Sequence, residues 1–350
     1  MESSPVRFAI IGAGAIAAFH ARAIAATSGA KLMAVHHPQR AKAEVFAGEH
    51  GGEPVSELDR LLGRADVDVV CITVPSGLHG DIAIRALEAG KHVLCEKPLE
   101  ITTARIDAML AAAERSGKVL AGVFQNRFAD GAQHLKRALE RGRFGRLSLC
   151  SAYLKWWRDP AYYSDSTWRG TKAMDGGGAL MNQGVHSVDL LQWLAGMPAR
   201  VTARVKTLVH DIEVEDSAVA CFEFPGGAMG VMEASTACYP GAPRRLEIMG
   251  EKGTAILEND RIIQWSFAEG EADDEAVLAT GPSENPVGGA ADPKAIGMEG
   301  HRRVVEDLAG ALREGRPPLV SGQEARKAVA VIEAIHRSSE TSKPVEPRAG

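Results

Sequence analysis

The sequence predicts an α/β protein of two domains, the first built on a parallel sheet and the second, of α+β type, built on a large and mostly antiparallel sheet. In residues 7–124, short β-branched runs alternate with alanine-rich helical segments, which is the pattern of βαβ units. Between about residues 200 and 265, strand-like stretches follow one another without an intervening helix, which favours antiparallel pairing. A chain of 350 residues usually forms two domains, and the change of pattern places their boundary between residues 125 and 126.

The first domain, residues 1–125, is predicted to alternate strands and helices from its first apolar run onward. The strands are short and apolar enough to be buried on both faces of a sheet. Pro75 stops the third strand, and Gly90 and Gly117 end two of the helices. The predicted strands are residues 7–11, 31–35, 67–74, 92–95 and 119–124, and the predicted helices are residues 15–27, 40–50, 78–89 and 102–116.

In the second domain, residues 126–350, a loop rich in Trp and Tyr precedes a helix predicted over residues 176–194. Residues 268–297 are acidic and rich in Gly and Pro, and they are predicted to form a surface excursion. The other predicted elements are helices at residues 129–141, 300–314 and 322–339 and strands at residues 147–153, 200–208, 217–224, 228–235, 244–249 and 254–257.

Composition excludes several classes of partner. A net charge of −5 offers no basic footprint for a nucleic acid. No apolar run approaches the roughly 18–20 residues that a membrane span needs, and the N-terminus lacks the pattern of a secretory signal. The five cysteines have no CxxC or metal-like spacing, which favours free thiols in a reducing compartment. The sequence therefore predicts a cytoplasmic protein without a nucleic-acid or membrane partner.

Residues 12–17 fit the dinucleotide pattern GxGxxG/A between a predicted strand and a predicted helix. Glycine permits a tight turn and lets the backbone approach a pyrophosphate, which the free N–H groups of a helix N-terminus then bind. We therefore expect Gly12, Gly14, Ala15 and Ile16 to bind the cofactor. The alternative is a glycine turn in an α/β domain that binds no nucleotide.

The end of the second predicted strand bears on the choice between NAD and NADP. An acidic residue usually stands about 20 residues after the glycines and holds the ribose 2′-hydroxyl, but here the chain reads His36-His37-Pro38-Gln39-Arg40. His37, Arg40 and Lys42 can tolerate or attract a 2′-phosphate. This favours NADP slightly, but the sequence leaves NAD and NADP open. On the alternative interpretation these side chains are solvated surface and a backbone group holds the ribose.

Glu96-Lys97-Pro98 stands at the carboxyl end of the fourth predicted strand, where ligands bind in open α/β sheets. A partly desolvated lysine there can hydrogen-bond a reacting hydroxyl and is poised to lose its proton, so Lys97 is a candidate catalytic residue. Glu96 is expected either to fix this lysine or to touch the nicotinamide ribose. The alternative is an ordinary strand-end lysine in water.

Asn182 and His186 are four residues apart in the helix predicted after the aromatic loop, so they share one face. Asp189 is expected to orient the imidazole and Asp175 to cap the helix start, and the glycines at residues 176–178 would let backbone approach a ligand. Both Asn182 and His186 are functional candidates, although a lone helical histidine is more often a core residue. No HxxxH or HxxE pair predicts a metal site, and no GxSxG predicts acyl transfer.

Together these motifs resemble the glucose–fructose oxidoreductase / inositol dehydrogenase / MocA (Gfo/Idh/MocA) family over essentially the whole chain. The marks of the resemblance are the glycine turn, Thr73-Val74-Pro75-Ser76 with His79, and residues 89–98, 176–189 and 246–254. The resemblance implies an N-terminal Rossmann domain with bound NAD(P) and hydride transfer at a sugar or cyclitol carbinol carbon. It further implies that the open face of the second sheet forms a homodimer or homotetramer.

Position by position, the resemblance implies that Lys97 is the catalytic lysine and His186 its partner. The residues that it places against the cofactor are Thr73, Pro75, Ser76 and His79. Many members have Asp where this chain has Asn182. Because an amide cannot accept a proton, the general base should be Lys97 or His186, while Asn182 can bind a substrate hydroxyl.

A closer resemblance, to the branch that holds UDP-N-acetylglucosaminuronate 3-dehydrogenases, rests on residues 162–171, 180–183 and 212–216. On this resemblance Arg169 could pair with a uronate carboxylate. The aromatic residues that could stack on pyranose faces or on the nicotinamide are Trp156, Trp157, Tyr163 and Trp168. The alternative, left open, is that Arg169 holds the helix or the cofactor and that the aromatic rings are core.

The sequence thus predicts an NAD(P)-dependent oxidoreductase that acts on a secondary hydroxyl, expected at C3, of a sugar, sugar derivative or cyclitol. Two other functions stay open on the same fold. An NAD-dependent glycosidase would use transient 3-oxidation as its opening step. A sugar-sensing protein without catalysis would not need Lys97 together with His186.

Overall fold

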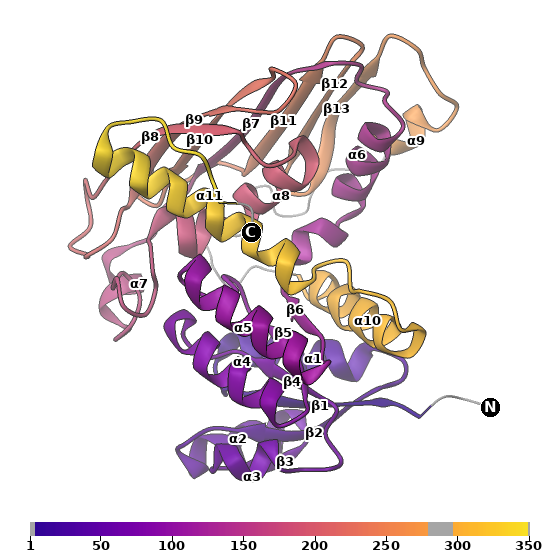
Figure 1. Cartoon of the computed structure of the whole chain (residues 1–350), viewed down its shortest axis with the longest axis vertical. Helices are drawn as coiled ribbons and strands as arrows, with labels where there is room; N and C mark the ends of the chain where they lie inside the picture. Colours follow the sequence, from indigo (N-terminus) through magenta and orange to yellow (C-terminus); the bar gives the residue numbers. More distant parts are fainter. Residues whose placement is uncertain (1–3, 279–296, 349–350) are drawn as a thin grey trace. The chain divides into compact units, whose positions relative to one another are not determined.

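The computed structural model describes residues 4–278 and 297–348 (Figure 1). The chain forms two compact units. Unit 1 comprises Met1–Gln125 and Gly297–Arg326, and unit 2 comprises Asn126–Ile296 and Lys327–Gly350. The segment of residues 297–326, which the sequence-based division assigns to the second domain, thus returns to the first unit.

Unit 1 contains a six-stranded sheet in the order β3-β2-β1-β4-β5-β6, and every strand pair is parallel. Its central strands are apolar, as expected for a sheet that is covered on both faces. The strands are β1 (Val6–Ile11), β2 (Ala30–His36), β3 (Glu53–Val55), β4 (Val69–Ile72), β5 (His92–Cys95) and β6 (Leu120–Gly122). The helices are α1 (Ala15–Ala26), α2 (Arg40–His50), α3 (Leu58–Leu62), α4 (His79–Glu88), α5 (Thr103–Ser116) and α10 (Glu299–Glu314).

Helices cover both faces of this sheet, as the direction of each crossover requires. The chain moves from β1 to β2 and β3 in one direction and from β4 to β5 and β6 in the other. Because crossovers between parallel strands are right-handed, α1 and α2 lie on one face and α4 and α5 lie on the other. α10 packs against α1, so the returning segment adds a helix to the first of these layers.

The strand order of this sheet reverses between β1 and β4, whose carboxyl ends are adjacent. Ile11 pairs with Ile72 at the last position of this ladder. The turn that starts at Gly12 and the loop that starts at Thr73 therefore lie side by side. In open parallel sheets, ligands bind outside the carboxyl ends of the strands at such a reversal.

Unit 2 contains a seven-stranded sheet in the order β13-β12-β11-β7-β10-β9-β8, in which β7 and β10 are parallel and the other pairs are antiparallel. The strands are β7 (Leu147–Lys155), β8 (Arg200–Lys206), β9 (Ser217–Glu223), β10 (Met229–Ser235), β11 (Arg245–Gly250), β12 (Gly253–Glu258) and β13 (Arg261–Phe267). The helices are α6 (Asp130–Glu140), α7 (Pro160–Ser164), the π-helix η3 (Ala179–Gly184), α8 (Val185–Ala195), α9 (Asp274–Leu278) and most of α11 (Gly322–Thr341).

One face of the unit 2 sheet is covered and the other is open. Buried and exposed side chains alternate along β9, which is the period expected when one face is solvated. α6 and α8 contact strands of the sheet, whereas Leu149, Val219 and Met229 are 46%, 54% and 59% exposed. Met229 is paired with Leu149, and Val219 is paired with Glu233 farther along the same strand. These three apolar side chains therefore share the open face.

The predicted fold class is confirmed: a parallel sheet is followed by a mostly antiparallel one. The sequence pattern missed β3, α3, α7 and α9, which have five residues or fewer and so give no readable period. It also missed β13, a strand of seven residues. The surface excursion predicted for residues 268–297 lies mainly outside the described residues, and its described part contains α9. Within residues 4–278 and 297–348, no helix has both the length and the apolar character to cross a membrane.

Candidate functional site

The turn after β1 in unit 1 has the geometry of a dinucleotide site. Gly12 has φ +115°, a conformation that other residues rarely adopt, and a Cβ there would lie 2.5 Å from Oγ1 of Thr73. Gly14 is the N-cap of α1, and a Cβ on it would meet nothing within 4 Å. No side chain in the described part of the chain caps this helix. Because Gly14 and Ala15 are exposed, the first N–H groups of α1 are open to an anion.

The loop after β4 is held against this turn. Oγ1 of Thr73 donates to the carbonyl oxygen of Ile11 at 2.9 Å. The ring of His79 is buried, and its Nδ1 and Nε2 lie 2.9 Å from the carbonyl oxygens of Pro98 and Val74. Burial lowers the pKa of His79, although both carbonyl oxygens favour the protonated imidazole. His79 therefore ties this loop to the peptide that follows Lys97, and its contact with the cofactor stays a prediction.

The end of β2 carries the groups predicted to bear on the choice between NAD and NADP. His37 is half-buried, and its Nδ1 accepts from the backbone N–H of Gln39 at 3.0 Å. Burial lowers the pKa of His37, with a contribution from the Lys42 charge. Nε of the exposed Arg40 donates to Glu44 at 2.8 Å. The imidazole is therefore mostly neutral near pH 7, and the Arg40 guanidinium already has a carboxylate partner.

Lys97 is half-buried and follows Glu96 at the carboxyl end of β5. The Glu96 side chain is buried, and its Oε2 accepts from the backbone N–H of Lys97 at 3.1 Å. Its other oxygen, Oε1, lies 2.8 Å from Nε2 of His20. Of the two roles that the sequence left open for Glu96, this arrangement matches the one in which it fixes the lysine.

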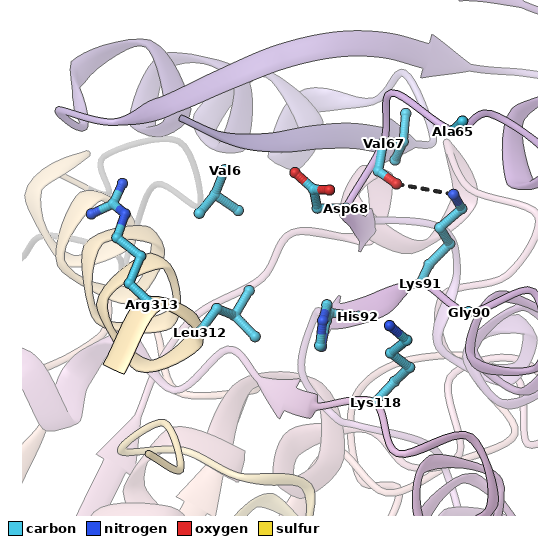
Figure 2. Close-up of a pocket in the computed structure, with 10 residues that line it drawn as sticks. All are labelled: Val6, Ala65, Val67, Asp68, Gly90, Lys91, His92, Lys118, Leu312 and Arg313. Carbon is cyan, nitrogen blue, oxygen red and sulfur yellow. Dashed lines mark hydrogen bonds between the residues drawn. The ribbon is translucent and has the colours of Figure 1, made fainter. Parts of the chain in front are cut away.

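A cavity of about 380 Å³ in unit 1 lies at the opposite edge of the same sheet (Figure 2). Val6 and His92, which line it, are the first residues of β1 and β5. Lys91, also in the lining, donates from Nζ to the carbonyl oxygen of Val67 at 2.9 Å (Figure 2). Because the glycine turn follows the carboxyl end of β1, this cavity is not the dinucleotide site.

In unit 2, the single helix predicted over residues 176–194 is two elements, the π-helix Ala179–Gly184 and α8. Oε1 of the buried Glu215 accepts from the backbone N–H groups of Gly178 and Leu180, each at 3.0 Å. A Cβ on Gly178 would lie 1.9 Å from the carbonyl oxygen of Glu215. Glu215 therefore binds N–H groups at the helix start, where Asp175 was expected to act as the cap, and Gly178 makes room for the backbone of Glu215.

Asn182, in the π-helix, is the centre of a polar network. Its Nδ2 donates to Oδ1 of Asp175 at 2.7 Å, and its Oδ1 accepts from Gln183 at 2.9 Å and from the Tyr162 hydroxyl at 3.4 Å. Gln183 also donates to the Tyr162 hydroxyl at 2.8 Å and accepts from Arg158 at 3.0 Å. Burial raises the pKa of Tyr162, so the phenol stays protonated. Asn182, Gln183 and Tyr162 are half-buried, so the network has a partly exposed edge.

Asp189, which was expected to orient His186, forms an ion pair with the buried Arg127. Nε and Nη2 of Arg127 donate to its two carboxylate oxygens at 2.8 Å and 2.7 Å, and both residues are buried. Removing one member of such a pair leaves an uncompensated buried charge, so this pair is structural. His186 is half-buried in the first turn of α8. It belongs to unit 2 and Lys97 to unit 1, so their convergence stays a prediction.

Tyr163 is a core residue, which corrects its assignment to the substrate. Its side chain is buried, its hydroxyl lies 2.9 Å from Oγ1 of Thr236, and its ring centroid lies 4.9 Å from that of His210. Trp157 is half-buried and packs against the same His210 at 5.8 Å. The alternative in which aromatic rings are core therefore holds for Tyr163.

Arg169 and Trp168 are half-buried. The Arg169 guanidinium lies against the Tyr162 ring and against the Trp168 ring. The Arg169 guanidinium carbon lies 4.4 Å from the Tyr162 ring centroid and 5.5 Å from the Trp168 ring centroid. Its Nη1 donates to the carbonyl oxygen of Tyr162 at 3.3 Å. Among the residues that the structure describes, no carboxylate lies within ion-pair distance of Arg169.

Sequence reasoning missed Tyr162, Gln183 and Glu215 as site residues. Gln183 offered a signal, because it is a second polar residue inside an otherwise apolar segment, directly after Asn182. Tyr162 and Tyr163 are adjacent in the sequence, and only the fold decides which of them faces inward. Glu215 lies 37 residues from Gly178, so no local pattern connects them.

Two family models match the chain. Residues 6–124 match the oxidoreductase family with an NAD-binding Rossmann fold, and residues 132–256 match the GFO/IDH/MocA C-terminal domain. The chain belongs to the GFO/IDH/MocA oxidoreductase family. The resemblance stated from the sequence motifs is thereby confirmed, over both units of the structure.

Similar proteins are sugar and cyclitol dehydrogenases. The WlbA dehydrogenase from Bordetella pertussis, solved in complex with NADH and UDP-GlcNAcA, is 32% identical with a TM-score of 0.89, over 99% of this chain and 98% of that chain. A levoglucosan dehydrogenase in complex with NADH and levoglucosan is 25% identical with a TM-score of 0.85, over 98% of this chain and 100% of that chain. Inositol 2-dehydrogenase of Rhizobium meliloti (strain 1021) is 28% identical over 95% of this chain and 96% of its own.

This protein is therefore an oxidoreductase with NAD as cofactor, from a family that acts on sugars and cyclitols. The residues present in unit 1 fit this cofactor. The uncapped N-terminus of α1 would hold the pyrophosphate. Ile16, in the first turn of α1, and Pro75, after β4, are half-buried, and the adjacent Ser76 is buried; that these three residues border the dinucleotide stays a prediction.

Proposed function

We propose that the protein is a dehydrogenase that oxidises a secondary hydroxyl, at C3, of a sugar that carries a carboxylate. The observation that carries this proposal is the Arg169 guanidinium. It is half-buried over the Tyr162 ring without a carboxylate partner among the described residues, and Tyr162 connects it to the amide of Asn182. A guanidinium binds a carboxylate bidentately, and the amide and phenol beside it suit sugar hydroxyls. The likeness to a dehydrogenase crystallised with UDP-GlcNAcA supports the proposal.

Each reacting group has a proposed residue. Bound NAD would supply the hydride acceptor. Lys97, as a free amine, would take the proton of the reacting hydroxyl, and His186 would either steer that hydroxyl or accept the proton itself. Asn182 would hold the hydroxyl and its ketone product in place, because an amide can bind both without competing for the proton.

NADP is proposed as a second cofactor. No acidic residue stands at the end of β2 to repel a 2′-phosphate or to select the 2′-hydroxyl. The Arg40–Glu44 pair and the lowered pKa of His37 weaken the attraction for that phosphate. We therefore expect tolerance of NADP, not selection for it.

A second copy of this chain is proposed to cover the open face of the unit 2 sheet, giving a homodimer or homotetramer. Leu149, Val219 and Met229 expose apolar surface there, and contiguous exposed apolar surface marks interfaces. A cytoplasmic location is proposed because all five cysteines are unpaired thiols.

A substrate panel with NAD tests the proposed function. UDP-GlcNAcA, UDP-GlcNAc, levoglucosan and myo-inositol are compared by NADH formation, and the carboxylated sugar is expected to have the highest kcat/KM. Arg169→Met should lower kcat/KM for UDP-GlcNAcA by about 10- to 100-fold, the scale of a lost charged hydrogen bond, and change the neutral sugars by less than about threefold. Arg146→Met, at a position 81% exposed in unit 2, is the matched control.

Two results would contradict the proposal. An Arg169→Met variant that keeps the wild-type preference for UDP-GlcNAcA over the neutral sugars would remove the assigned role of the guanidinium. Release of UDP without accumulation of NADH would instead show a glycosidase that uses oxidation only transiently.

A further inference from the structure

Three titratable side chains of unit 1 converge from three separate elements: His20 on α1, Glu96 after β5 and His301 on α10. Each is 5% exposed or less. Oε1 of Glu96 lies 2.8 Å from Nε2 of His20 and 3.6 Å from Nε2 of His301. The two imidazole rings meet edge to face with centroids 5.3 Å apart. The first contact is a hydrogen bond and the second is a longer, electrostatic contact.

The protonation states of Glu96 and His20 follow from their burial and from the contact between them. A buried carboxylate needs donors. Burial raises the pKa of Glu96, but the two imidazoles outweigh burial and hold its pKa well below the ordinary value. Burial lowers the pKa of His20 by more than Glu96 raises it. His20 is therefore a neutral imidazole that donates its Nε2–H to an anion, which is a charge-assisted hydrogen bond.

The outer ring nitrogens distinguish this arrangement from a metal site. His20, Glu96 and His301 form the group that, among the described residues, could hold a metal ion. A histidine that ligates a metal through Nε2 normally donates its Nδ1–H to a further partner. Nδ1 of His20 and Nδ1 of His301 are buried without a hydrogen-bond partner in the part of the chain that is described. Buried N–H groups without acceptors are rare, so both histidines fit the Nε2–H tautomer.

We propose that His20 and His301 are positioning residues that act on Lys97 through Glu96. The proposal rests on the proposed catalytic role of Lys97. The second oxygen of Glu96 accepts the backbone N–H of Lys97 at 3.1 Å, so the imidazoles hold the carboxylate and the carboxylate holds the peptide that carries the lysine. His20 belongs to the helix whose N-terminus fits the pyrophosphate. The cluster thereby keeps the lysine in a set position relative to the cofactor helix.

His20→Gln and His301→Gln test this role. Each should lower kcat by about 10- to 100-fold, because a displacement of about 1 Å in a reacting group costs that much. The Kd for NAD should stay within about threefold. His92→Gln is the matched control, since His92 is half-buried at the amino end of β5 and its Nδ1 accepts from Val119 at 3.0 Å. Circular dichroism at the assay temperature confirms the folded fraction of each variant.

A double-mutant cycle separates positioning from a general structural role. In the Lys97→Ala background, adding His20→Gln should change the residual kcat by less than about twofold, because the group that it positions is gone. A further loss equal to that of His20→Gln alone would show that His20 acts elsewhere, and would overturn the proposal.

Long-range ¹H–¹⁵N NMR of the wild-type imidazoles provides a readout that does not depend on activity. At pH 7, His20 should give the neutral Nε2–H tautomer, and His301 should carry a proton on Nε2. An Nδ1–H tautomer at either residue, or an imidazolium at His20, would overturn the proposal. One equivalent of zinc or nickel in the purified protein, lost in His301→Gln, would show a metal site and would also overturn it.

The outcomes distinguish this proposal from the proposed function. If Lys97→Ala keeps the wild-type kcat, the catalytic role of Lys97 on which the proposed function rests is wrong. If Lys97→Ala is inactive while both histidine variants match the wild type, only the positioning role fails.

Discussion

At the scale of single residues, the backbone of Lys97, the proposed catalytic residue, is held by the side chain of its neighbour Glu96. The Glu96 carboxylate accepts the Lys97 N–H, so the peptide that carries the amine is fixed at the strand end. Lys97→Ala is expected to lower kcat by about 10²- to 10⁴-fold, the contribution of a positioned acid–base group. Steady-state kinetics measures the loss, and an NAD titration should show a Kd within about threefold. Lys31→Ala, an exposed lysine on β2, is the control, and near-normal turnover of Lys97→Ala would remove the assignment.

The residue His37 is predicted to influence the preference between NAD and NADP. The wild type should use NADP within about tenfold of NAD in kcat/KM, because no carboxylate follows β2. His37→Asp introduces a carboxylate that binds the 2′-hydroxyl and repels a 2′-phosphate, so the preference for NAD should rise at least about tenfold. Parallel assays with NAD and NADP measure the ratio of the two kcat/KM values. His50→Asp, at the far end of α2, is the control. A wild type that ignores NADP would refute the prediction.

At the scale of elements, the π-helix Ala179–Gly184 shows where local pattern stops being sufficient. The apolar spacing predicts a helix here, and α8 is one, but the turn before it takes its shape from Glu215, whose carboxylate binds the N–H groups of Gly178 and Leu180. Likewise, Tyr163 rather than Tyr162 faces inward because its hydroxyl meets a residue 73 positions away. Such choices depend on contacts that no local window contains.

Glu215 also connects this segment to α11. Oε2 of Glu215 lies 3.2 Å from Nε2 of His336. Burial raises the pKa of Glu215, but His336 and backbone donors outweigh it, so this pKa is lowered. Burial lowers the pKa of His336, but Glu215, with Glu340 and Glu333, outweighs it, so this pKa is raised.

The directions of the two pKa shifts define the pH range over which the Glu215–His336 pair stabilises the folded state. The stabilisation from His336 is fully present below its unfolded pKa of about 6.5 and is lost as pH rises through its raised folded pKa. The stabilisation from Glu215 is fully present above its unfolded pKa of about 4.3 and is lost as pH falls through its lowered folded pKa. The Tm difference between wild type and His336→Gln should therefore be largest near pH 5.5 and shrink toward pH 9. Calorimetry at several pH values measures it.

The control for this prediction is His134→Gln, in the same unit, where burial lowers the histidine pKa. That variant should not show the same pH profile. A Tm difference for His336→Gln that is constant from pH 5.5 to pH 9 would mean that the pair contributes only packing.

At the scale of the whole molecule, the two sheets were predictable because each has a local signature. Alternating helices and strands specify parallel β1 to β6, and consecutive strands with alternating burial specify most of the second sheet. Two features had no such signature. α10 returns to unit 1 after the second sheet, and β7 pairs in parallel with β10. Both are long-range choices, decided by which apolar face each element covers.

The open face of the second sheet is predicted to form the interface of a homodimer or homotetramer. Met229→Glu places a charge among apolar side chains where the wild-type residue is 59% exposed, and a desolvated charge is costly in an interface. Light scattering should find a dimer or tetramer for the wild type and smaller species for this variant. Val45→Glu, at a position 65% exposed in unit 1, should leave the assembly unchanged. A monomeric wild type would contradict the proposed interface.

The central claim is that this protein moves a hydride from C3 of a carboxylated sugar to NAD. Turnover of UDP-GlcNAcA labelled with deuterium at C3, followed by mass spectrometry of the reduced cofactor, tests it most directly. We expect each NADH formed to carry one deuterium and the sugar to become a 3-ketone. NADH without the label, or no NADH from this sugar, would contradict the claim.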